Sequence, residues 1–291
     1  MKKLVLVGCA LGALAVPAMA ADMRVKAPIL KAPPPVFSWT GCYLGGNGGW
    51  KWGRFGETVD TTGGTAIIPG LATTPFAAGH ISFDGVRTDS GAAGGQIGCR
   101  WESADHWVLG GEGDFDWTNL HATAVVTQPA AVAPFPFTTG DSFGNHARWE
   151  SSARIVVGHT WDRVFLYATG GVAFSRVTMD ANFVAVTFGG VPFPASAGSD
   201  SRTLVGGTIG AGGAYALDQS WSIGAEYRFT AYQKDDFGLG SVAAVCGFPT
   251  FPAGAGVQCA NAAVTGHKDL QTHEILFKLN YQLGGPFFGK L

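Results

Sequence analysis

The sequence predicts an all-β protein: a closed antiparallel eight-stranded transmembrane β-barrel with long external loops, preceded by a signal peptide. Three observations lead to this prediction. Polar and apolar residues alternate with period 2 from about residue 39 onward, as they do in strands. The chain is 46% hydrophobic and 14% charged, yet after residue 20 it has no run of about 18 apolar residues that would form a spanning helix. Short and long connections alternate between the segments, as in outer-membrane barrels.

The N-terminus has the three parts of a secretory signal. Lys2 and Lys3 give a positive start, residues 4–16 are apolar, and Ala18-Met19-Ala20 has the small-x-small form of a cleavage site. We therefore expect a signal peptide over residues 1–20 and export to the outer membrane of a Gram-negative cell.

The remaining chain divides by composition. Residues 21–37 are rich in Pro, Ala and Lys without periodicity, which predicts a Pro-rich periplasmic tether. Residues 38–284 carry the alternating pattern and predict the barrel. Residues 285–291 form a C-terminal tail.

Eight segments show the strand pattern. The stretch WVLGGEGDFDWTNL is typical: Leu109, Phe115 and Trp117 share one parity, and acidic residues occupy the other. The segments are residues 42–52, 90–102, 107–120, 148–158, 164–175, 203–217, 221–232 and 272–281. Each is near the length of about 9–11 residues that a tilted strand needs to cross a bilayer.

The connections differ in length in a regular way. The turns SADH, TWDR and LDQS are short, whereas residues 54–89, 118–147, 177–201 and 236–268 are predicted as long external loops. These loops are rich in Ala, Pro, Phe and Val. Such apolar loops either contact another surface or pack among themselves.

Tryptophans fall at the strand ends. With the N-terminus in the periplasm, Trp161 and the others sit near one interface or the other, as an aromatic girdle requires. The predicted girdle consists of Trp39, Trp50, Trp52, Trp101, Trp107, Trp117, Trp149 and Trp221.

Charged residues occupy the parity that faces the barrel interior. Glu112, Asp114 and Asp116 lie in one strand, and Arg100 and Arg154 lie in its neighbours. No His or Cys shares this face at metal-ligand spacing, and glycosidase chemistry needs an open cleft between two acids. Because an eight-stranded barrel is only just wide enough for its side chains, we expect a salt-bridge lattice that plugs the lumen. Its predicted members are Arg100, Glu102, Glu112, Asp114, Asp116, Glu150, Arg154, Glu226, Arg228, Glu274 and Lys278.

Four cysteines remain after the predicted cleavage, in an oxidising compartment. Cys246 and Cys259 share the last external loop, and Cys42 and Cys99 lie near the ends of adjacent strands. We expect a disulfide within each pair.

The histidines predict no site. His80, His121, His146 and His267 fall in or beside external loops, and His80 with Asp84 is the one weak candidate for a catalytic pair. The sequence therefore predicts no enzyme, no cofactor and no metal site.

Several stretches resemble a known family. FSWTGCYLGGNGGWKWG, GGQIGCRWE, YATGGVAF and IGAGGAYAL followed by WSIGAEYRF are similar to the small alphaproteobacterial outer-membrane proteins of the porin-family or immunogenic type, over about residues 36–284. The resemblance implies an eight-stranded barrel like the transmembrane domain of OmpA. It also implies an abundant surface protein that supports envelope integrity; a few members bind heme or behave as pores.

The predicted function is therefore structural: an outer-membrane barrel with a charge-plugged lumen and surface loops for interaction. The alternative is a small-solute porin or a heme- or nutrient-binding surface receptor. Expected partners are outer-membrane lipids and lipopolysaccharide, the barrel-assembly machinery, and neighbouring barrels or host and phage surfaces. Net charge is −2, which gives no electrostatic footprint for nucleic acid.

Overall fold

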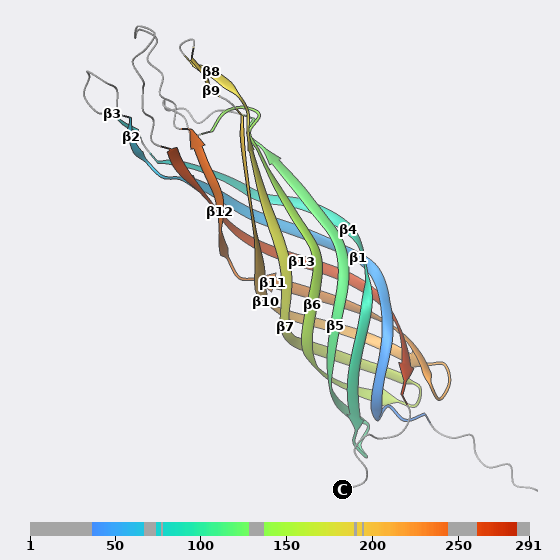
Figure 1. Ribbon diagram of the computed structural model, residues 1–291. Coiled ribbons are helices and arrows are strands. Elements are labelled where there is room, and N and C mark those ends of the chain that lie inside the picture. The colour runs from blue at the N-terminus through green and yellow to red at the C-terminus, as the bar shows by residue number, and fades with distance from the viewer. Residues whose placement is uncertain are drawn as a thin grey trace, which may run out of the picture. The chain divides into compact units, whose positions relative to one another are not determined.

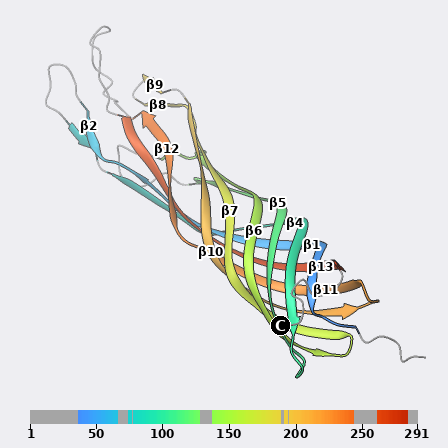
Figure 2. The same cartoon turned by 60° about the horizontal axis from the view of Figure 1, so that its bottom comes forward.

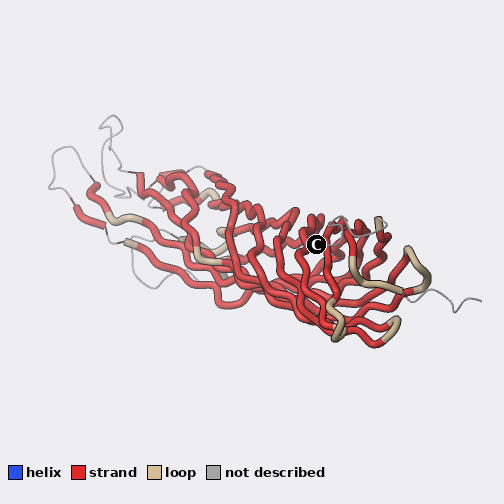
Figure 3. Tube along the Cα trace, turned by 90° about the horizontal axis from the view of Figure 1, so that it is seen from below, coloured by secondary structure: helices blue, strands red, loops and turns tan. Residues whose placement is uncertain are grey.

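The computed structural model describes residues 37–66, 74–76, 78–127, 137–188, 191–193, 195–243 and 261–283. These residues form strands and turns, without helices (Figure 3). None of them builds a helix with the length and hydropathy of a membrane span. The predicted signal peptide, the tether up to residue 36 and the tail lie outside the described residues.

One antiparallel sheet of nine strands makes up most of the described chain, in the order β1-β4-β5-β6-β7-β10-β11-β13-β12 (Figures 1 and 2). Its strands are β1 (Gly41–Thr61), β4 (Gly79–Glu102), β5 (Trp107–Val125), β6 (Ser142–Trp161), β7 (Val164–Phe183), β10 (Ser196–Ala216), β11 (Trp221–Tyr232), β12 (Asp235–Ala243) and β13 (Asn261–Gln282). Two short hairpins, β2 (Gly64–Ala66) with β3 (Thr74–Phe76) and β8 (Val186–Phe188) with β9 (Val191–Phe193), are separate.

The first and last long strands also pair with each other. β1 pairs with β13 from Tyr43 opposite Gln282 to Thr61 opposite Val264. β12 continues along β13 where β11 stops. Eight long strands, counting β11 and β12 as one, therefore each have a hydrogen-bonded neighbour on both sides.

The two ends of the sheet differ. The connections Ser103–His106, Asp162–Arg163 and Leu217–Ser220 are tight, as predicted, and we call this the tight-turn end. At the other, extended end the strands continue far into the segments predicted as loops. That prediction was wrong because the alternation of buried and exposed residues does not stop at membrane length. Inward Phe55 and Val59 on β1 pack into a core there.

A bulge in β6 reverses the parity of one segment. The register shifts between Ala147 and Glu150 against β7, and both residues are buried. Arg148, which simple alternation would turn inward with Glu150 and Arg154, is therefore exposed.

The outward face carries apolar side chains between two rows of tryptophan. Trp101, Trp107, Trp161 and Trp221 are exposed near the tight-turn end, and Trp50, Trp52 and Trp117 are exposed further along. Exposed residues such as Ile97, Leu109, Ile155, Ile209 and Phe277 lie between the rows. An apolar surface of this extent is not typical of a water-soluble face.

Candidate functional site: a charged layer between two apolar layers

The site includes three acidic residues on the inward face of β5. Glu112, Asp114 and Asp116 are each at most 7% exposed, whereas Phe115 and Trp117 between and beside them are exposed. Period-2 alternation places the three carboxylates on one side of the strand. Buried charge of this kind is tolerated only with ionic or hydrogen-bonding partners.

Arg154 on β6 is the first of two arginine hubs. Its guanidinium forms short charged hydrogen bonds with Glu112 and Glu226. Its Nη2 also donates to Asp114 Oδ2 over 2.7 Å. The side chain is fully buried, and its contacts reach from the neighbouring strand β5 to β11.

Arg228 on β11 is the second hub. Its Nη1 lies 3.2 Å from Asp114 Oδ1 and 3.0 Å from Glu274 Oε1, and its Nε donates to Glu226 Oε1 over 3.2 Å. Asp116 lies 3.5 Å from the same guanidinium. The two arginines therefore share Asp114 and Glu226.

Two lysines complete the layer. Lys278 Nζ donates to Glu112 over 2.7 Å and to Glu226 over 2.6 Å. Lys51 Nζ lies 2.6 Å from Glu150 and 3.2 Å from Glu274. We call the following set the charged layer: Lys51, Glu112, Asp114, Asp116, Glu150, Arg154, Glu226, Arg228, Glu274 and Lys278.

The lattice predicted from sequence does not include Lys51. Lys51 lies between the outward residues Trp50 and Trp52, so the alternation places it on the inward face. Its pairing with Glu150, 99 positions away, depends on the fold and has no local signal.

Arg100 does not join the charged layer, contrary to the prediction. Its guanidinium carbon lies 4.0 Å from the ring centroid of Tyr43 and 5.1 Å from that of Trp39, with Phe165 at 5.4 Å. No described carboxylate forms an ion pair with it. Arg100 sits closer to the tight-turn end than Glu112 does, and Tyr43 fills the gap by donating its hydroxyl proton to Glu112 over 2.6 Å.

Glu102 also serves another purpose than predicted. Its carboxylate accepts hydrogen bonds from the backbone N–H of Trp39 over 3.1 Å and from the hydroxyl of Thr160 over 2.5 Å. Because Glu102 lies at the end of β4, it anchors the chain entering the sheet instead of reaching the charged layer.

Trp39 was predicted in the aromatic girdle, and this was wrong. The residue is 1% exposed and packs inside, against Phe37 and Phe165. Phe37, assigned to the tether, is likewise buried. The chain enters the interior before β1 begins, so the parity of β1 does not apply to these residues. We call Phe37, Trp39, Tyr43, Arg100, Val108, Val156, Phe165 and Tyr167 the aromatic layer.

The third layer fills the extended end. Its core contains Phe55, Phe143, Met179, Leu239 and Leu270, all buried. We call this cluster the outer apolar layer. The three layers follow one another along the inward face, so the charged groups lie between two apolar regions.

Two buried ionisable residues, Glu57 on β1 and Lys268 on β13, lie opposite each other in register within the outer apolar layer, beyond Trp52. Lys268 Nζ lies 4.2 Å from the ring centroid of Phe55 and has no hydrogen-bond partner among the described residues. Burial lowers the pKa of the Lys268 ammonium to about 7. Burial also raises the pKa of Glu57, whose Oε2 accepts a hydrogen bond from Asn145 over 2.7 Å. Both shifts follow from the cost of ionising a group away from water.

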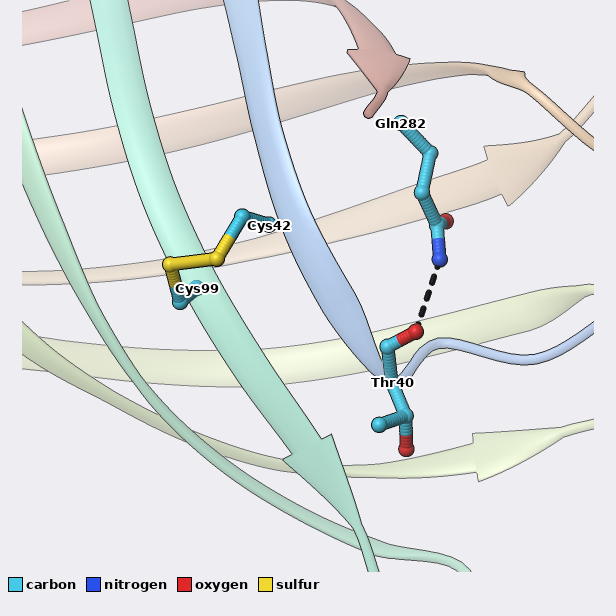
Figure 4. Close-up of a disulfide and its surroundings, with 4 residues drawn as sticks. All are labelled: Thr40, Cys42, Cys99 and Gln282. Atoms are coloured by element: carbon cyan, nitrogen blue, oxygen red, sulfur yellow. Dashed lines mark hydrogen bonds between the residues drawn. A yellow bond between two sulfur atoms is a disulfide. The ribbon is translucent and has the colours of Figure 1, made fainter. Parts of the chain in front are cut away.

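The seam between β1 and its neighbours is linked covalently near the tight-turn end. Cys42 and Cys99 lie opposite each other in register and form a disulfide (Figure 4). On the other side of β1, Gln282 Nε2 donates to the carbonyl oxygen of Thr40 over 2.8 Å. Cys246 and Cys259 lie outside the described residues.

The histidines predicted in loops lie on strands. His80 Nδ1 is 2.5 Å from Asp60, and His267 also contacts Asp60, over 3.1 Å. The rings of His121 and His146 stack across β5 and β6. Asp84's side chain is outside the described set. Within the described residues, no group of three or more His, Cys, Asp and Glu is arranged to hold a metal ion.

Comparison with known proteins decides the family. Residues 7–282 match the family described as "Outer membrane protein beta-barrel domain". The chain belongs to this family. It is 30% identical over 223 residues to the 31 kDa outer-membrane immunogenic protein of Brucella melitensis, covering 75% of this chain and 82% of that protein. It is 24% identical over 208 residues to the 22 kDa outer membrane protein of Rhizobium leguminosarum, covering 71% of each. The protein is thus an outer-membrane β-barrel protein.

Solved structures are more distant. The outer membrane protein OprG of Pseudomonas aeruginosa is 10% identical with a TM-score of 0.34, covering 84% of this chain and 97% of that one. The outer membrane protease OmpT of Escherichia coli is 8% identical with a TM-score of 0.35, covering 82% and 97%. At such scores neither neighbour bears on the function of this family member.

Proposed function

We propose that this outer-membrane protein is a closed eight-stranded barrel with a sealed lumen, and that its role is structural, in supporting the envelope. The pairing of β1 with β13 supports closure. The two rows of exposed tryptophan support a membrane span between them. In this orientation the tight-turn end faces the periplasm, and a cleaved signal peptide over residues 1–20 and a tether up to residue 36 precede the barrel.

One observation carries the proposal: Arg154 on β6 reaches Glu226 on β11. β7 and β10 lie between these strands in the sheet, so the contact crosses the interior. A lumen bridged by two side chains, with apolar layers above and below, offers no continuous water path. This arrangement supports a structural barrel over a diffusion pore, and the proposal includes no catalytic activity.

Solute entry into vesicles tests the proposal. Lipid vesicles containing the mature chain, residues 21–291, are loaded with an impermeant polymer and diluted into isotonic arabinose. We expect no swelling beyond that of protein-free vesicles. Swelling that depends on the amount of folded protein would contradict a sealed lumen.

The surface loops remain the proposed interaction surface, toward neighbouring barrels or host and phage surfaces. The segments predicted as apolar loops fall in part on residues 67–73, 128–136 and 244–260, outside the described residues. The assembly machinery and lipopolysaccharide remain expected partners of any protein of this membrane.

A further inference from the structure

A pocket lined mainly by polar and charged residues opens on the outward face where β4, β1 and β13 run side by side. It has a volume of about 560 Å³, and its lining includes Trp52, Arg54, Arg87, Asp89, Gln271 and His273. Trp52 belongs to the outer row of exposed tryptophans. The pocket therefore begins where the apolar belt ends.

Arg54 and Arg87 face each other directly across β1 and β4. Like charges in opposite positions of neighbouring strands destabilise a sheet. Among the described residues, neither guanidinium has a carboxylate within ion-pair distance. Two adjacent cations in this arrangement are suited to an anion that both can share.

The backbone of β4 makes room for Arg54. The register between β1 and β4 shifts between Phe55 and Glu57, and Gly85 in the bulge has a φ of +72°. A Cβ atom on Gly85 would fall 2.5 Å from Arg54 Nε. The positive φ favours glycine at this position, and the absence of a side chain leaves free the space that the Arg54 guanidinium occupies.

Other cations stand at the same boundary. Arg148 immediately precedes Trp149 on β6, and Arg176 lies two positions after Phe174 on β7. Both arginines are exposed. Aromatic side chains mark the interface of a membrane barrel. The arginines next to them therefore lie at the level of the lipid headgroups.

We infer that the pocket between Arg54 and Arg87 binds the phosphorylated sugar headgroup of an outer-leaflet glycolipid. The inference rests on the proposed membrane orientation. The two guanidinium groups bind the phosphate. Asp89 accepts hydrogen bonds from sugar hydroxyls, and the Gln271 amide both donates and accepts them. The Trp52 ring covers the apolar side of the headgroup and the start of an acyl chain.

His273 closes one side of the pocket. The Tyr227 hydroxyl lies 2.7 Å from His273 Nδ1, which fixes the imidazole ring against β11. The Phe229 ring packs on it with the centroids 4.9 Å apart. The wall is therefore preformed and does not depend on the ligand to order it.

Lipid retention tests the site. The full mature chain in detergent micelles is mixed with bisphosphorylated lipid A, with its dephosphorylated form, or with phosphatidylglycerol, and bound lipid is counted by native mass spectrometry. We expect the bisphosphorylated lipid to be retained roughly tenfold more tightly than either other lipid, the effect of one charge-assisted hydrogen bond.

Matched variants locate the site. The double variant Arg54→Gln/Arg87→Gln should lose this preference, and Gly85→Ala should weaken it without any change in charge. The double variant Arg148→Gln/Arg176→Gln removes the same charge at the same boundary and should keep the preference. Equal loss in the two double variants, or equal retention of phosphatidylglycerol, would overturn the inference.

The test is independent of the sealed lumen. Vesicle swelling by the wild-type protein would refute the proposed function and leave lipid retention unchanged. Loss of the phosphate preference with no swelling would refute the pocket and leave the proposed function standing.

Discussion

Arg154 and Glu226 are 72 positions apart in the chain and meet in a buried charged hydrogen bond. They belong to β6 and β11, which are not neighbours in the sheet. The same guanidinium also holds Glu112 and Asp114. The interior at this level is therefore as narrow as two side chains, and Arg154 is one of the four buried cations that fill it.

Removing the Arg154 guanidinium should lower the free energy of unfolding. In Arg154→Met, three buried carboxylates lose a partner, and breaking a buried ion pair typically costs ~3–5 kcal/mol. In Arg100→Met, a cation stacked on aromatic rings is replaced by an apolar chain, with an expected loss of ~0.5–2 kcal/mol. Urea unfolding in lipid vesicles measures both. Equal losses of stability in the two variants would show that Arg154 is not a hub of the charged layer.

The buried lysine predicts an unusual pH dependence. Lys268 has a pKa of about 7 in the folded protein and an ordinary value of 10.5. Between these values the unfolded chain holds the proton and the folded chain does not, so stability should rise as pH increases from 7 to 9. The slope should approach ~1 kcal/mol per pH unit.

The lysine is isolated by a matched pair of variants. A Glu57→Gln background removes the carboxylate opposite Lys268, and adding Lys268→Met to it should flatten the slope and stabilise the protein at pH 7. Urea midpoints at pH 7, 8 and 9 give the answer. A slope that survives the methionine would assign the effect to another group.

The disulfide should stabilise the folded state without being needed for folding. Cys42 and Cys99 enclose a separation of 57 residues, and closing a loop of that size contributes ~2–4 kcal/mol through the unfolded chain. The β1–β4 ladder holds the strands in register without it. Cys42→Ser/Cys99→Ser should therefore fold, with a lower urea midpoint.

The second cysteine pair must be removed from the comparison. The chain with Cys42 and Cys99 and its Cys42→Ser/Cys99→Ser variant are both made in a Cys246→Ser/Cys259→Ser background. A disulfide in the last loop then cannot contribute to the difference in midpoint. An unchanged urea midpoint would contradict this prediction, because it would mean that the disulfide does not restrict the unfolded chain further.

The inward and outward faces could be predicted from local alternation alone. Period 2 placed Glu112, Asp114 and Asp116 on the face that the structure buries, because side-chain direction in a strand depends only on position. Alternation also placed Cys42 and Cys99 on adjacent strand ends, where they are joined.

What the pattern missed depends on longer-range packing. The β6 bulge, which turns Arg148 outward, depends on the register with β7, where two residues of β6 stand against one. Trp39 lies in the interior because its ring packs against Phe37 and Phe165 of the aromatic layer. Its residue type alone predicted the girdle, where tryptophan is common. The extended strands escaped prediction because the assumed length was that of the bilayer, whereas the outer apolar layer supports pairing beyond it.

Single-channel recording tests the sealed lumen most directly. The mature chain is folded into a planar lipid bilayer and current is recorded at fixed voltage, with heat-unfolded protein from the same detergent stock as the control. The account predicts no stable conductance, with at most rare brief flickers. Regular, long-lived steps that require folded protein would contradict it, and would make the charged layer around Arg154 the lining of a pore.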